Sequence, residues 1–94
     1  MTDSFIGRAW YDDGREYDDR SWGHQSVEPF IVRINNKTGQ FSFQTNELDE
    51  VQTCIKLAIN EFFCKRLGLN ERMTILADTN KKIHVILRFY LEEV

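Results

Sequence analysis

The sequence lacks the segments that would place it in a membrane or direct it to secretion. Its 94 residues contain no apolar run of about 18 residues, the length that a membrane-spanning helix needs. The N-terminal segment MTDSFIGRAW lacks a basic stretch followed by an apolar one, so no secretory signal is expected. The composition therefore predicts a soluble cytoplasmic protein with no membrane partner.

Cysteine is scarce as well, because only Cys54 and Cys64 occur. Both fall in a predicted helix, where ten intervening steps would separate them by about 15 Å. A disulfide allows only about 4–7 Å between Cα atoms, so an intramolecular bridge is excluded. Two free thiols are typical of a reducing compartment. We interpret both cysteines as small buried hydrophobic residues.

The chain also lacks the motifs of common catalytic and cofactor sites. It has no glycine-rich phosphate loop, no paired-cysteine motif and no serine elbow. His84 has no neighbour in sequence that would serve as a nucleophile. Cys64 lies near the C-terminus of the predicted helix, where the dipole opposes thiolate formation. We predict that the protein is not an enzyme, with no catalytic residue, no metal ligand and no cofactor.

The net charge of −3 is unevenly distributed. Residues 1–28 hold seven acids and three bases, whereas residues 29–94 hold eight acids and nine bases. The net negative charge therefore lies in the N-terminal third. Since phosphate contacts need Lys and Arg, this distribution disfavours direct nucleic-acid binding through that segment.

One long amphipathic helix is predicted between Asn46 and Gly68, about 21 residues in length. Asn46 is expected to cap its N-terminus. Gly68 is expected to adopt the left-handed conformation after its last turn, with Leu69 folding back onto Phe63 or Cys64. The apolar positions recur at intervals of three and four: Leu48, Val51, Ile55, Ala58, Ile59, Phe62 and Phe63.

The dipeptide Asp13-Gly14 predicts a two-residue hairpin turn, because a type I′ turn needs positive φ at both central positions. The turn would join a strand over 5–12 to a second over 15–20, although the Asp-rich second segment also fits an irregular loop. Its register would set residues of opposite charge or aromatic character across from each other: Asp12 with Arg15, Trp10 with Tyr17 and Arg8 with Asp19.

Two further hairpins are predicted. Residues 30–35 alternate in hydrophobicity, and the turn sequence NNKTG leads into a returning strand at Phe41 and Phe43. Residues 73–78 and 83–91 form another pair around a polar turn. Residues 23–29 are interpreted as a connector. The order hairpin, hairpin, helix, hairpin predicts a single α+β domain over residues 1–94, with a mainly antiparallel sheet of four to six strands and one long helix on one face.

Candidate partner-binding residues gather in the first hairpin, where Trp, Tyr and Arg are interleaved with acids. Trp, Tyr and Arg are enriched at interface hot spots, and a short hairpin cannot bury four large aromatic side chains internally. The candidates are Trp10, Tyr11, Asp12, Asp13, Arg15, Glu16, Tyr17, Asp18, Asp19 and Trp22.

These features predict a small non-enzymatic protein-binding module, an acidic inhibitor or modulator of a larger protein with a basic surface. In length, acidity and lack of cofactor motifs, the chain is similar to small inhibitor, immunity and antitoxin-type proteins. The acids would accelerate encounter with a basic partner, and they would mimic nucleic acid if that partner binds nucleic acid.

Three alternatives remain open. In the first, the chain forms a homo-oligomer, such as a homodimer, through a sheet edge or through the mixed face of Ile31, Ile86 and Tyr90. In the second, the Asp-rich hairpin binds a metal or acts as a pair of catalytic carboxylates. In the third, the acidic cluster is only the solvated rim of a hairpin.

Overall fold

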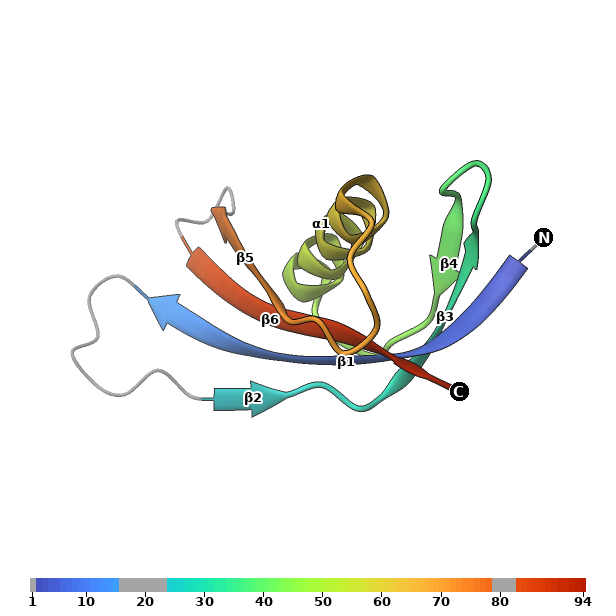
Figure 1. Ribbon diagram of the computed structural model, residues 1–94. Helices are drawn as coiled ribbons and strands as arrows, with labels where there is room; N and C mark the ends of the chain where they lie inside the picture. Colours follow the sequence, from blue (N-terminus) through green and yellow to red (C-terminus); the bar gives the residue numbers. More distant parts are fainter. Residues whose placement is uncertain (1, 16–23, 79–82) are drawn as a thin grey trace.

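The structure is a computed structural model that describes residues 2–15, 24–78 and 83–94. Its one described helix, α1 (Asp49–Lys65), lies across one face of an antiparallel sheet (Figure 1). The predicted apolar stripe is confirmed along most of its length, since Val51, Ile55, Ala58 and Ile59 are at most 1% exposed. The predicted α+β class is therefore correct.

The helix begins later than predicted. Leu48, not Asn46, is the N-cap residue, and no side chain caps the helix there. Leu48 has extended backbone angles and is 63% exposed, so it does not belong to the apolar stripe. The side-chain Nε2 of Gln52 donates to the carbonyl oxygen of Glu47 at 2.8 Å, just before the helix. The prediction failed because residues 44–48 are used to connect the sheet to the helix.

The helix also ends before Gly68. Arg66 adopts the left-handed conformation, with φ 51° and ψ 47°. The backbone N–H of Leu67 donates to the carbonyl of Phe62 at 3.1 Å, and that of Arg66 donates to Phe63 at 3.2 Å. These two bonds form a Schellman motif two residues earlier than predicted. Leu67, rather than the exposed Leu69, folds back onto the core.

Replacing Arg66 with glycine is expected to raise the free energy of unfolding by about 0.5–1 kcal/mol, because glycine adopts the left-handed conformation without a steric penalty. Urea denaturation measures this change. The matched control is Lys65→Gly, within the helix, which should lower stability by about 1 kcal/mol. Destabilisation by both substitutions would contradict the assignment of Arg66 to the left-handed position.

The sheet is built around β1 (Thr2–Arg15), which pairs with strands on both of its sides. The strand order is β4-β3-β1-β6-β5, with β2 also paired to β1, and every pair is antiparallel. The other strands are β2 (His24–Ser26), β3 (Phe30–Asn35), β4 (Phe41–Phe43), β5 (Met73–Asp78) and β6 (Ile83–Glu93). The predicted β3–β4 and β5–β6 hairpin pairings are confirmed.

The predicted turn at Asp13-Gly14 is wrong, because β1 continues through it to Arg15. Positions Phe5 to Arg15 pair in unbroken register with Glu93 to Ile83 of β6. A ladder of this length outweighs the local preference of one dipeptide for a turn. The predicted strand 15–20 lies mostly outside the described residues.

The segment predicted as a connector contains β2 and a β-bulge. Trp10 is paired with Ser26, and Gly7 is paired with Phe30. Three residues, 27–29, therefore lie opposite only two residues of β1. The one extra residue lies in the segment between β2 and β3 and forms the bulge. Val27 keeps a hydrogen bond from its N–H to the carbonyl of Ala9, at 2.9 Å. Pro29, which has no N–H, occupies the bulge where no ladder bond is needed.

The sheet separates its residues cleanly into two faces. Leu87, Phe89 and Leu91 of β6 are fully buried beneath α1. The register places Ala9 opposite Phe89, so the buried residues of β1 share this face. The intervening residues of both strands point to the opposite side, which α1 does not cover (Figure 1).

Candidate interaction surface

The side of the sheet that points away from α1, called the outer face below, carries an unusual set of side chains. Among the described residues, aromatic, arginine and acidic side chains lie on it beside the small polar residues Ser4, Ser42 and Thr74. Strands β1 and β6 contribute alternate residues to its centre. Its larger side chains include Arg8, Trp10, Asp12, Ile31, Arg33, Arg72, Leu76, Ile86, Arg88, Tyr90 and Glu92.

Three residues of the outer face form one cluster, the Arg72 cluster, consisting of Trp10, Arg72 and Tyr90. The Trp10 and Tyr90 rings meet edge to face, with centroids 5.9 Å apart and an interplanar angle of 78°. The guanidinium carbon of Arg72 lies 5.3 Å from the Trp10 centroid and 5.6 Å from that of Tyr90. Both distances allow a cation–π interaction, so one arginine holds two aromatic rings in a fixed arrangement.

Two ion pairs flank this cluster along β1 and β6. Arg8 Nε lies 2.8 Å from Glu92 Oε2, and the hydrogen bond and charge of Glu92 raise the pKa of Arg8 above its usual value. Arg88 Nη1 donates to Asp12 Oδ2 at 3.0 Å. Such partly exposed pairs add little to stability, because solvent screens them. Their effect here is to fix side-chain positions on either side of the aromatic rings.

The structure separates the predicted partner-binding residues. Trp10 and Asp12 lie on the outer face, whereas Tyr11 points into the core and is only 9% exposed. Asp13 and Arg15 are positions of β1 paired with β6. The rest of the candidates lie outside the described residues: Glu16, Tyr17, Asp18, Asp19 and Trp22.

Three residues of β1 contact side chains of β6: Arg8 pairs with Glu92, Asp12 pairs with Arg88, and Trp10 contacts Tyr90. The predicted partners Tyr17 and Asp19 lie outside the described residues. The period-two pattern of β6 placed Arg88 and Tyr90 on one face. No local signal showed that β6 would lie beside β1.

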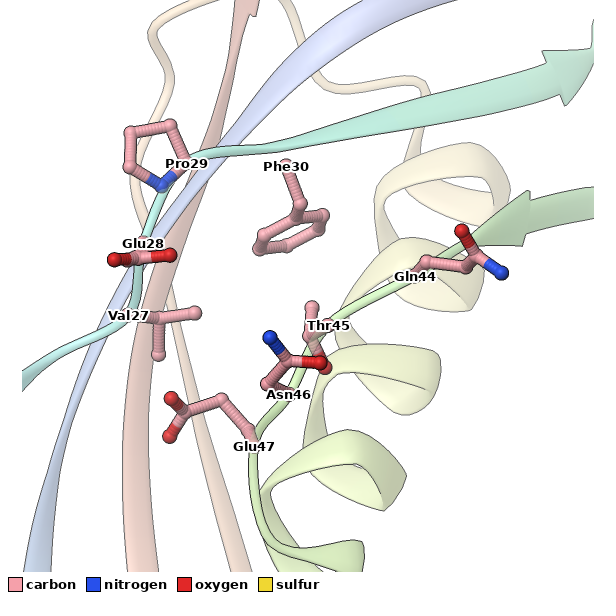
Figure 2. A pocket seen from close by; sticks show the side chains of 8 residues that line it. All are labelled: Val27, Glu28, Pro29, Phe30, Gln44, Thr45, Asn46 and Glu47. Atoms are coloured by element: carbon pink, nitrogen blue, oxygen red, sulfur yellow. The ribbon is translucent and has the colours of Figure 1, made fainter.

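A cavity of about 670 Å³ opens where the bulge faces the link between β4 and α1 (Figure 2). Val27 and Phe30 supply apolar wall, and Glu28 and Glu47 bring two carboxylates to its lining. Thr45 Oγ1 is buried and has no hydrogen-bond partner. Among the described residues, no group of three His, Cys, Asp or Glu side chains is placed to hold a metal ion.

The cysteines are only partly as predicted. Cys54 is 1% exposed, and burial raises the pKa of its thiol above the usual value. Cys64 is exposed, so its interpretation as a buried residue is wrong. Neither thiol forms a disulfide.

Comparisons with protein-family models, with curated proteins and with solved structures find no match to this chain. In the described part of the chain, no helix is long and apolar enough to cross a membrane.

Proposed function

We propose that the protein is a non-enzymatic binding module that docks a protein partner on its outer face, as an inhibitor or modulator of that partner. The observation that carries the proposal is the Arg72 cluster. Trp, Tyr and Arg are the residues most enriched at interface hot spots. Here one of each is held in a fixed arrangement on a sheet face that α1 leaves uncovered.

The surroundings of the cluster support this role. The ion pairs Arg8–Glu92 and Arg88–Asp12 give it a polar border that is already neutralised. Ile31 is 45% exposed and Leu76 66% exposed, so apolar surface is available farther out. An aromatic centre with a polar, charge-paired border is the usual anatomy of a protein–protein interface.

Protein fits this surface better than nucleic acid does. Stacking of bases needs free aromatic faces, but Arg72 already occupies positions over both rings of its cluster. Arg8 and Arg88 are paired with carboxylates and so are less available for phosphate. The net charge of −3 also opposes a polyanion.

The partner is proposed to have a basic surface, since the acids of the N-terminal third would attract it over long distances. We place this interaction in the cytoplasm, which is consistent with two cysteines that form no disulfide.

The test is affinity capture from the native cell extract with the wild-type protein and the double variant Trp10→Ala/Arg72→Ala. Truncation of two hot-spot residues should weaken capture of a true partner at least about tenfold. The matched control is Lys56→Ala/Leu57→Ala, two exposed residues of α1, which should capture the same partner as the wild type.

Two outcomes would contradict the proposal. Capture that is equally strong with the Trp10→Ala/Arg72→Ala variant would show that the outer face is not the docking surface. Capture that disappears after nuclease treatment would show that the ligand is nucleic acid.

With the purified partner, added salt should lower the association rate more than it raises the dissociation rate.

A further inference from the structure

The two edges of the sheet differ in how they are protected against pairing with another chain. Strand β4, at one edge, has only three residues, and very short edge strands resist pairing. Strand β5, at the other edge, has six residues, MTILAD, with no proline, glycine or lysine among them. Among the hydrogen bonds of the described residues, none reaches the free side of β5 from another segment.

Strand β5 also carries exposed apolar surface. Met73 and Ile75 are 9% and 8% exposed and hold the strand against the core. Leu76 points the other way and is 66% exposed, beside Ile86 of β6 in the ladder. An edge strand that is anchored to the core and exposes a leucine is a typical site for pairing with another strand.

We infer that β5 pairs with β5 of a second copy of this chain, in antiparallel orientation about a two-fold axis at Ile75. Residues directly opposite in an antiparallel pair point to the same face. The core-facing sides of the two sheets therefore form one continuous face only if a core-facing residue of one copy lies opposite a core-facing residue of the other. Ile75 opposite Ile75 of the other copy meets this condition. Leu76 then lies opposite Thr74 of the other copy, on the outer face.

The self-complementarity of the segment favours a second copy over an unrelated strand. With the axis at Ile75, the pair three positions from the axis sets Arg72 opposite Asp78, residues of opposite charge in the sequence. The axis stands perpendicular to the sheet, so both helices lie on the same side of one continuous sheet. A closed two-fold dimer is the commonest assembly of identical chains.

Sedimentation equilibrium of the purified protein, from micromolar to millimolar concentration, measures this association. The wild type should be a reversible dimer, and Leu76→Lys should raise the dissociation constant at least about tenfold, because a charge at an edge strand blocks pairing. Leu57→Lys, an exposed leucine on α1, is the matched control and should dimerise like the wild type. A wild-type monomer at every concentration would overturn the inference.

Cysteine cross-linking tests the register in a Cys64→Ser background, which removes the exposed native thiol. Opposite Cα atoms are about 4.5–5.5 Å apart, within disulfide range. An equal mixture of Thr74→Cys and Leu76→Cys proteins should therefore form mainly the mixed disulfide. Predominant Leu76→Cys homodisulfide would overturn the axis at Ile75. These measurements use this chain alone, so their failure is distinct from failure of the proposed partner binding.

Discussion

Replacing Phe89 with alanine is expected to lower the free energy of unfolding by about 3–5 kcal/mol. Phe89 is fully buried at the middle of β6, opposite Ala9 on one side and Met73 on the other. Its ring stacks 6.4 Å from that of Phe30. Because both neighbours across the ladder are already buried, the sheet cannot collapse easily into the space that the ring leaves.

This loss is large for a chain of this length, since small domains are stable by only about 5–15 kcal/mol in total. Urea denaturation followed by circular dichroism measures it. Leu57→Ala, at an exposed position of α1, should stay within about 0.5 kcal/mol of the wild type. A comparable loss from both variants would contradict the placement of the core on one face of the sheet.

Replacing Gly7 with alanine is expected to cost about 1–3 kcal/mol, because the added methyl group overpacks the core. A Cβ atom at Gly7 would lie 2.5 Å from Cε2 and 2.7 Å from Cζ of Phe30. The Phe30 ring has little room to retreat, since it packs 5.5 Å from the Phe43 ring as well as against Phe89. Glycine is therefore needed at this position for close approach rather than for an unusual backbone angle.

A double-mutant cycle with Phe30→Leu isolates this contact. The shorter leucine side chain should relieve the clash, so Gly7→Ala should cost at least about 0.5 kcal/mol less in that background. Gly68→Ala is the control, because the nearest atom to an added Cβ is 3.8 Å away, on Glu71. Equal costs for Gly7→Ala in both backgrounds would show that Phe30 is not the group it meets.

The elements that the sequence predicted well are those decided by local periodicity. The buried stripe of α1 and the alternation of β6 follow from how side chains project from a helix and a strand. The β3–β4 turn follows from its residues too: Asn35 Oδ1 accepts from the backbone N–H of Lys37 at 2.9 Å, and Gly39 has φ 77°. Each feature depends on residues close together in the chain.

The prediction failed where a distant strand competed with a local preference. Asp13-Gly14 favours a turn by itself, but pairing with β6 extends β1 straight through it. The helix ends moved for a related reason. The path from β4 delays the start to Asp49, and Leu67 reaches the core two residues before the predicted Leu69.

By itself the sequence determined which residues could share a face, because the periods of helix and strand are properties of the backbone. It placed Trp10 among the candidate contacts and Tyr90 on a mixed face, but it left Arg72 out of the candidate contacts. Only the tertiary structure brought these three together, from three segments far apart in the chain. Strand order depends on burying one common apolar face beneath α1, and that is a property of the whole chain rather than of any segment.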